Sequence, residues 1–352
     1  MITGNDPVAC SNCFSDRGLQ LDAERIGKDN SDLCPNCGAT EFKKLSLAGV
    51  GALAHRFFVW GSMWRARYGA APLIQFNDHQ KTSIDVAPWL ASDVQLIEQL
   101  LGVGFFHYGP RLWMVGEVEP LKALQKERRR QSVIDRILTE YPARELNAVD
   151  AFYRVRINPA IPGDKGQYDS PPPQHVGRGR LDSAGNPALY GSSDLEVCVH
   201  ECRVSAEDEI FVATLAPSKT LRLLDLSVLL KEENITEFES LDMSVHMLFL
   251  AGKHAYKITR AIADAARTSG FDGIVYPSYF SLLRLGQMPF QTTYGISHRL
   301  IPQLQEHEQA KSIQNLALFG SPISEGKVAV SCIDRLIISR VAYDFHFGPT
   351  GA

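Results

Sequence analysis

The sequence predicts an α+β protein of two or three domains, with a small cysteine-rich lobe at its start. Three observations support this prediction. The chain has 352 residues, 45% of them hydrophobic and 22% charged, which is enough to bury a sizeable core. Short segments of strand-like pattern lie between helical stretches in the C-terminal half. Two CxxC pairs lie close to the N-terminus.

The cysteine pairs predict a zinc site. The four residues are Cys10, Cys13, Cys34 and Cys37. Each CxxC turn points two sulfurs at one tetrahedral ion, and the intervening segment is long enough to bring the pairs together. Four thiolates leave no open position, so we expect a structural Zn²⁺ and a lobe, residues 1–44, that folds only with its metal. The mixed charges of this lobe favour a cap or a protein contact over nucleic acid.

Charge and hydropathy exclude several other classes. A net charge of −4 gives no general attraction to nucleic acid or to an anionic membrane, although nucleic-acid binding by the lobe stays open. The N-terminus lacks a signal-peptide pattern, and the most apolar run, residues 45–54, is too short to cross a bilayer. We therefore expect a cytoplasmic protein without membrane contact. Cys198 and Cys202, one helical turn apart, are expected to be buried rather than redox-active.

Residues 45–147 are predicted to form a mixed, mainly helical N-terminal or regulatory domain. Apolar residues at helical spacing, from Leu53 to Trp64, predict a helix that ends before Pro72. A second helix follows Ser92. Beyond it we expect a hairpin of strands 105–108 and 112–115, and then one helix over 119–141 that carries a solvated basic face.

Residues 148–352 have a different pattern. Residues 152–157 alternate apolar and polar side chains and predict a strand. The next segment, 158–178, is rich in proline and glycine, and a loop this long is typical of a functional segment. The remaining elements expected here are strands at 208–215, 220–226, 271–276 and 333–343 and a helical region over 228–268.

The stretch 177–201, GRGRLDSAGNPALYGSSDLEVCVHE, holds the densest set of candidate site residues. Gly179 and Arg180 lie in a segment suited to anions, and Tyr190 ends a short strand. A helix capped by Ser192 or Ser193 then carries Glu201. Taken alone, each side chain has a structural alternative: a salt bridge for Glu201, a core position for Tyr190, a sheet-face charge for Arg154 and a strand-end hydroxyl for Ser278. No Cys/His pair, GxSxG elbow, Walker loop or HExxH motif indicates another catalytic class.

From Phe152 onward the chain resembles the RES domain, a family named for an arginine, a glutamate and a serine. Its members are toxins of bacterial toxin–antitoxin pairs and effectors in larger proteins. The segments that carry the resemblance occur in family order: Tyr153-Arg154, Gly179-Arg180, Gly185 to Tyr190, Glu201, Gly270 to Ser278, and Phe347 to Pro349.

The resemblance implies an ADP-ribosyltransferase-like fold over residues 148–352, with split, antiparallel-rich sheets, flanking helices and NAD⁺ in the cleft. It also implies cleavage of the nicotinamide–ribose bond. Glu201 would stabilise the oxocarbenium-like ribose, and Tyr190 would stack on nicotinamide. Arg154 would bind the pyrophosphate or an incoming phosphate. The other implied contacts are the ribose or amide for Ser278 and a phosphate for Gly179-Arg180.

The sequence departs from the family pattern in two places. Leu181-Asp182 follows the Gly-Arg pair, and extra residues follow Ser278, so Ser281 is an alternative to it. Three functions remain open: an NAD⁺ glycohydrolase or phosphorylase acting as a toxin or defence effector, an ADP-ribosyltransferase that modifies a macromolecule, and a non-catalytic zinc-ribbon adaptor for nucleic acid or protein. Control by a cognate antitoxin or regulatory protein is expected, because free NAD⁺ cleavage would deplete the cell.

Overall fold

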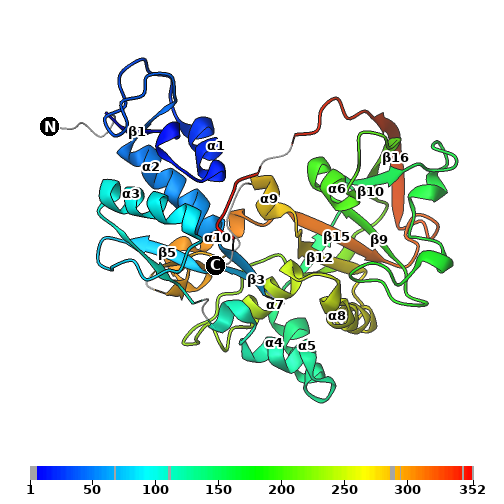
Figure 1. Cartoon of the computed structure of the whole chain (residues 1–352). Coiled ribbons are helices and arrows are strands. Elements are labelled where there is room, and N and C mark those ends of the chain that lie inside the picture. The colour runs from blue at the N-terminus through cyan, green and yellow to red at the C-terminus, as the bar shows by residue number, and fades with distance from the viewer. Residues whose placement is uncertain are drawn as a thin grey trace. The chain divides into compact units, whose positions relative to one another are not determined.

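The computed structural model describes residues 6–66, 69–109, 112–285, 290–293, 295–342 and 345–350. The chain divides into two compact units. The first unit comprises residues 1–66, 70–111 and 342–352, and the second comprises 67–69 and 112–341. This division differs from the predicted boundaries after residues 44 and 147. Residues 112–147 join the second unit because two of its helices, α4 (Glu119–Gln125) and α5 (Glu127–Glu140), pack on α7 (Leu241–Leu250) and α8 (Tyr256–Thr268) respectively (Figure 1). In addition, β7 (Ala143–Leu146) pairs with β11 (Leu221–Asp225).

The first unit combines three α-helices with short strand pairs in its described residues. Strand β1 pairs with β2, β3 with β4 and β5 with β6, each pair in a sheet of its own. Asp16 caps α1 by accepting from Leu19 N at 2.9 Å, which defines where the helix begins. The bounds are β1 Pro7–Cys10, α1 Arg17–Ile26, β2 Lys44–Ser46, α2 Leu47–Ala54, β3 Met63–Ala66, β4 Gly69–Pro72, β5 Ile74–Asn77, α3 Ala91–Leu101 and β6 Gly104–His107.

Two predictions for this unit need correction. The helix that starts with α2 continues as a π-helical segment only to Trp60, and the chain then forms β3, so the predicted helix is too long. The predicted hairpin of 105–108 with 112–115 is wrong: β6 pairs with β5, and residues 112–115 form a 3₁₀ helix. The pairing with β5 buries Phe105, whose ring lies 4.5 Å from Phe58 and 5.4 Å from Phe76.

The C-terminal segment, residues 345–350, belongs to the first unit. Phe347 N donates to Asp22 Oδ2 at 3.1 Å, and the Phe347 side chain packs against the unit's core. Arg25 lies 4.0 Å over the Phe345 ring and donates to its carbonyl oxygen at 2.9 Å. The Phe347–Pro349 turn, which resembles the closing turn of the RES domain, therefore packs outside the unit that holds the rest of the resemblance.

The second unit is built on an eight-stranded sheet with the order β16-β10-β8-β9-β15-β12-β11-β7. Figure 1 labels β16, β10, β9, β15 and β12 of this sheet. Within the described residues, β11 and β12 are its one parallel pair. Strands β8 and β9 share the single residue pair Tyr153–Ser192, so the sheet splits there into halves of three and five strands. The predicted α+β fold with split, antiparallel-rich sheets is confirmed. The bounds are β7 Ala143–Leu146, β8 Phe152–Ile157, β9 Ala188–Ser192, β10 Ile210–Pro217, β11 Leu221–Asp225, β12 Gly273–Pro277, β15 Gln314–Phe319 and β16 Val328–Leu336, with a separate pair, β13 Thr292–Thr293 and β14 Ile296–Ser297.

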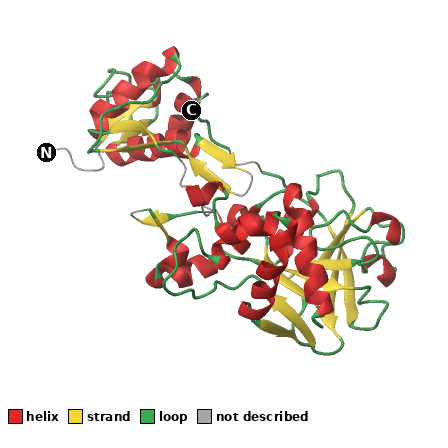
Figure 2. Cartoon of the chain, turned by 90° about the horizontal axis from the view of Figure 1, so that it is seen from below, coloured by secondary structure: helices red, strands yellow, loops and turns green. Residues whose placement is uncertain are grey.

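Helices pack against this sheet, as the colours of Figure 2 show. Their bounds are α4 Glu119–Gln125, α5 Glu127–Glu140, α6 Leu195–Cys202, α7 Leu241–Leu250, α8 Tyr256–Thr268, α9 Ser281–Leu285 and α10 Gln305–Ala310. The predicted helix 119–141 is two helices, because Lys126 adopts an extended conformation between them. Helical structure in 228–268 begins only at Leu241. The last strand, β16, ends at Leu336, before the predicted strand's end at residue 343.

Strand β15 has the greatest consequence for the site. No strand is predicted at residues 314–319, yet β15 lies inside the sheet between β9 and β12. Its register places Asn315 opposite Ser192 on one side and Tyr276 on the other. Because cross-strand partners share a face, these three side chains and Tyr190 lie on one side of the sheet. Among the described residues of both units, no helix is long and apolar enough to cross a membrane.

Candidate active site

Helix α6 holds Glu201 against the sheet. Asp194, rather than the predicted Ser192 or Ser193, caps the helix and accepts from Val197 N at 2.9 Å. Ser192 instead ends β9. Val197 and Cys198 are buried, and Cys198 Sγ lies 3.3 Å from the Tyr153 carbonyl oxygen. Burial raises the pKa of Cys198 to about 12, which agrees with its predicted role as a buried, unreactive side chain. Glu201 lies in the last turn and is exposed.

Two neutral side chains fix the carboxylate of Glu201. Ser278 Oγ donates to Glu201 Oε1 at 2.7 Å, and Asn315 Nδ2 donates to the same oxygen at 2.6 Å. Both donors are buried, at 2% and 3% exposure, and Ser278 Oγ also accepts from Phe280 N. None of the described residues donates a hydrogen bond to Oε2. The arrangement leaves one oxygen of an exposed, oriented carboxylate available to a ligand.

Tyr276 lies next to this carboxylate. It is buried on β12, and its ring stacks on Phe249 of α7 with centroids 5.2 Å apart. Burial raises the pKa of the Tyr276 hydroxyl well above its ordinary value, the Glu201 carboxylate raises it further, and Arg180 acts in the opposite direction. Tyr276 therefore lies close to both Glu201 and the Gly-Arg stretch. Sequence reasoning missed Tyr276 and Asn315; the available signals were a tyrosine two residues before Ser278 and an asparagine at the start of an apolar run.

Tyr190, Gly179 and Asp182 form a second cluster. The Tyr190 hydroxyl donates to Asp182 Oδ1 at 2.7 Å and accepts from Leu181 N at 2.8 Å. Asp182 is 1% exposed, and its other oxygen accepts from Gly177 N. A Cβ on Gly179 would overlap Asp182 Oδ1 and lie 2.6 Å from the Tyr190 hydroxyl. The Asp182 carboxyl, which departs from the family pattern, thus holds the glycine-rich turn together from its inner side.

The two arginines are held by backbone carbonyls. Arg180 donates to Leu248 O at 3.2 Å and to Ala251 O at 2.9 Å, at the C-terminal end of α7, where a cation complements the helix dipole. Arg154 lies on the opposite face of β8 from Tyr153. It donates to the carbonyl oxygens of Tyr190 at 2.6 Å and Asp169 at 2.9 Å, across the split between β8 and β9.

Arg154 is 5% exposed, and its Nε has no hydrogen-bond acceptor among the described residues. Burial and, to a smaller extent, the nearby Arg156 lower the pKa of Arg154 to about 9, so the guanidinium still carries its charge at neutral pH. The structure therefore joins Glu201 directly to Ser278, joins Tyr190 to Gly179 through packing, and links Arg154 to Tyr190 through the backbone.

The alternative serine has different partners. Ser281 Oγ donates to Ile313 O at 3.0 Å and accepts from Ile313 N at 2.9 Å, so it holds two chain segments together. Ser278 also contacts this segment, through its backbone N and Ile313 O. Of the two serines, Ser278 is the one that contacts Glu201.

The proline-rich loop 158–178 is held in place at its centre. Tyr168 is fully buried in the core of the sheet. The Asp169 carboxylate accepts from Ser324 N at 2.8 Å and Ser324 Oγ at 2.7 Å. A cavity of about 300 Å³ lies beside this anchor, lined by the loop and by residues around Pro187 and Ser324. This volume is at the lower end of the range for small-molecule pockets.

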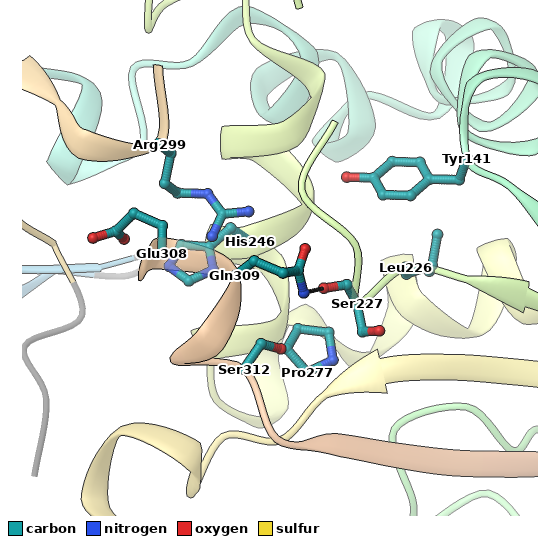
Figure 3. Close-up of a pocket in the computed structure, with 9 residues that line it drawn as sticks. All are labelled: Tyr141, Leu226, Ser227, His246, Pro277, Arg299, Glu308, Gln309 and Ser312. Atoms are coloured by element: carbon teal, nitrogen blue, oxygen red, sulfur yellow. Dashed lines mark hydrogen bonds between the residues drawn. The ribbon is translucent and has the colours of Figure 1, made fainter. Parts of the chain in front are cut away.

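A second pocket, drawn in Figure 3, is small and polar. Its volume is about 10 Å³, which is room for a single water molecule. Arg299, which lines it, forms a buried ion pair with Asp242 at 2.7 Å, and Gln309 donates to the carbonyl of Ser227 at 2.9 Å. The pocket also contains Pro277, the residue before Ser278. The pocket is too small for a cofactor, so we assign its lining residues a structural role behind the segment that carries Ser278.

The four cysteines of the first unit form a metal-binding arrangement. The sulfur atoms of Cys10, Cys13, Cys34 and Cys37 all lie within 4.8 Å of one another, with separations of 3.4 to 3.7 Å between three neighbouring pairs. Tetrahedral Zn–S bonds of about 2.3 Å place sulfurs about 3.8 Å apart, so the cluster fits Zn²⁺. The predicted grouping of the four residues is confirmed.

A family comparison matches part of the second unit. Residues 151–286 match the family model described as the RES domain. The predicted resemblance is confirmed for this segment. It contains Arg154, Tyr190, Glu201 and Ser278, whereas Asn315 lies beyond it.

Two further comparisons add little to the RES match. A chain in the crystal structure of the M. tuberculosis MbcT–MbcA toxin–antitoxin complex is 12% identical, with a TM-score of 0.35, and the match covers 58% of this chain and 92% of that chain. A likeness this weak assigns no residue and no activity. No curated protein matches the sequence.

Proposed function

We propose that the RES domain cleaves the nicotinamide–ribose bond of NAD⁺, as a glycohydrolase or phosphorylase, and that the protein acts as a bacterial toxin or defence effector. The observation that carries this proposal is the Glu201 carboxylate. It is exposed, yet one of its oxygens is fixed by two buried donors, from β15 and from the end of β12. A surface glutamate with a purely structural role does not need such support.

The chemistry requires a fixed negative charge. Loss of nicotinamide builds positive charge on the anomeric carbon and ring oxygen of the ribose, as in glycoside cleavage. A carboxylate that is already oriented stabilises this charge without rearranging during the reaction. In this proposal Oε2 of Glu201 faces the ribose, while Ser278 holds Oε1. Ser278 then orients Glu201, in addition to making the contact with the ribose or the amide that the family resemblance implies.

The other residues take supporting roles in the proposal. The Tyr190 hydroxyl is bonded to Asp182, which leaves the ring to pack on nicotinamide. Arg154 offers its unpartnered Nε to the pyrophosphate or to an incoming phosphate, and a ligand there would compete with the carbonyl oxygens that the guanidinium now binds. Gly179 lets the turn approach Tyr190 closely, and Arg180 completes the turn with a positive charge for a phosphate.

The proposal also covers the cysteine cluster of the first unit and a protein that controls the activity. Cys10, Cys13, Cys34 and Cys37 would bind a structural Zn²⁺, since four thiolates fill its coordination sphere. An enzyme that consumes NAD⁺ depletes the cell that makes it, so we propose control by a cognate antitoxin or another regulatory protein that blocks the Glu201 site.

Product analysis tests the reaction and identifies the acceptor. The full-length protein is incubated with NAD⁺, with and without inorganic phosphate, and the products are separated and identified by mass spectrometry. Nicotinamide with ADP-ribose shows hydrolysis, and nicotinamide with ADP-ribose 1″-phosphate shows phosphorolysis. Nicotinamide release together with ADP-ribose attached to a macromolecule in added cell extract shows transfer instead and replaces the leading proposal. Absence of nicotinamide in every arm contradicts NAD⁺ cleavage.

A further inference from the structure

Asn315 occupies a rigid position that reaches Glu201 from the middle of the sheet. It lies on β15 and is paired with Ser192 of β9 on one side and Tyr276 of β12 on the other. The side chain is 3% exposed, and its Nδ2 lies 2.6 Å from Glu201 Oε1. The two residues are 114 positions apart in the sequence, so the contact depends on strand register and not on local structure.

The Glu201 carboxylate determines which way the Asn315 amide faces. A carboxylate accepts hydrogen bonds, so the amide nitrogen must face Glu201; a flipped amide would place two oxygens against each other. With Nδ2 committed in this way, Oδ1 is buried without a donor from any described residue. Buried acceptors of this kind are rare and costly in folded proteins. An aliphatic side chain of similar size would avoid that cost, and it would lose the contact with Glu201.

We propose that Asn315 is a positioning residue for the NAD⁺ cleavage proposed above, which fixes the Glu201 carboxylate so that Oε2 faces the ribose. The inference rests on that proposed function for its role in turnover. Ser278 alone does not define the carboxylate plane, because one hydroxyl donor lets the group rotate about the bond. A second donor from another strand removes this freedom. Asn315 lies outside the residues matched to the RES family model and completes the site from a strand that the match does not include.

Three titratable groups around Glu201 do not change their protonation in the pH range of the test. Cys198 and Cys202 belong to the same helix, and Tyr276 comes from β12. In each of the three, burial raises the pKa most, and the charge of Glu201 raises it further. Arg154 and Arg156 partly oppose this at Cys202, the backbone of Ser192 opposes it at Cys198, and Arg180 and a hydrogen bond with the Asn315 side chain oppose it at Tyr276. These groups stay protonated through the acid and neutral range. His200, next to Glu201, stacks on the Phe280 ring at 5.9 Å.

The test compares turnover and its pH profile in the full-length protein. Asn315→Ala should lower kcat by roughly 10- to 100-fold with little change in KM, because a misplaced catalytic group is costly while substrate contacts remain. Loss of a donor to the ionised carboxylate favours its protonated form. The acid limb of the kcat profile should therefore move to higher pH.

A matched control separates positioning from stability. Ser192 pairs with Asn315 on the next strand, is equally buried, and donates to Gln314 O at 2.6 Å without contacting Glu201. Ser192→Ala should lower the melting temperature and leave the pH profile unchanged. If Asn315→Ala fails to fold, Asn315→Asp keeps the shape and places a second carboxyl against Glu201, which should move the acid limb further. An unchanged profile in a folded Asn315 variant overturns the inference.

A readout without substrate keeps this inference separate from the proposed function. The carboxyl ¹³C signal of Glu201, assigned by its loss in Glu201→Gln, should titrate at higher pH in Asn315→Ala than in the natural sequence. A shifted signal in a protein that does not cleave NAD⁺ would retain the positioning role and refute the reaction. Cleavage of NAD⁺ with an unshifted signal would retain the reaction and refute the role of Asn315.

Discussion

Substitution of Gly179 by alanine should disrupt the turn beside Tyr190. The added methyl would overlap Asp182 Oδ1 and lie 2.6 Å from the Tyr190 hydroxyl. Neither group can move freely, because the two atoms are hydrogen-bonded to each other at 2.7 Å. Leu181 N also donates to the Tyr190 hydroxyl, and Gly177 N donates to the other carboxyl oxygen of Asp182. The substitution therefore combines overpacking with the loss of a buried hydrogen bond to a carboxyl.

The expected cost follows from these two effects. Overpacking typically costs about 1–3 kcal/mol, and a hydrogen bond to a charged group contributes about 1.5–3 kcal/mol. Together they should lower the free energy of unfolding of the second unit by about 3–5 kcal/mol, which corresponds to a fall in its Tm of roughly 10 °C. Urea and thermal unfolding followed by circular dichroism measure both quantities.

The chain provides a control for this prediction in Gly163. It lies in the neighbouring proline-rich loop, and a Cβ there would meet no atom within 4 Å. Gly163→Ala should leave stability unchanged or raise it by about 0.5 kcal/mol, because alanine restricts the unfolded chain. If Gly179→Ala is as stable as Gly163→Ala, the Asp182–Tyr190 cluster does not organise the turn and our account of it is wrong.

Three further predictions concern the cysteines and the C-terminal segment. Cys34→Ser should reduce bound zinc, measured by atomic absorption, and lower the stability of the first unit while NAD⁺ cleavage persists; full zinc content would contradict the structural role. Phe347→Ala should destabilise the first unit by about 1–3 kcal/mol, because the Phe347 ring fills the space beside Gly18 and packs against the core of the unit; an unchanged unfolding curve would refute this. At pH 8, iodoacetamide should modify exposed Cys332 and spare Cys198, whose pKa burial raises to about 12, as peptide mass spectrometry would show; equal labelling would contradict the packing of α6.

Local sequence patterns predict the cysteine cluster and the elements that carry Glu201 and Ser278, whereas the roles of these two residues come from the family resemblance. The CxxC spacing predicts the sulfur cluster because each pair is one turn of chain. The position of Glu201 follows from helical spacing after a strand, and Ser278 follows directly after a buried strand. In each case the residues that define the feature lie within a few positions of one another.

The rest depends on strand register and long-range packing. Asn315 was missed because β15 is a short apolar run whose partners, β9 and β12, lie elsewhere in the sequence. Arg180 is typical of a phosphate contact in its local sequence, yet its present partners are carbonyls of α7, about 70 residues away. Long-range packing also explains why the position of the C-terminal segment was not predicted. Nothing in the sequence near Phe347 indicates that it would contact Asp22 and Gly18.

The measurement that tests the central claim most directly is nicotinamide release from NAD⁺ by three full-length proteins: the natural sequence, Glu201→Gln and Glu196→Gln. Both glutamates lie on α6, but Glu196 pairs with Arg284 at the surface and has no part in the proposed chemistry. Our account predicts release by the natural sequence and by Glu196→Gln, and a loss of at least about 10²-fold in Glu201→Gln at unchanged stability. Equal release by all three proteins would contradict the assignment of Glu201 as the catalytic carboxylate.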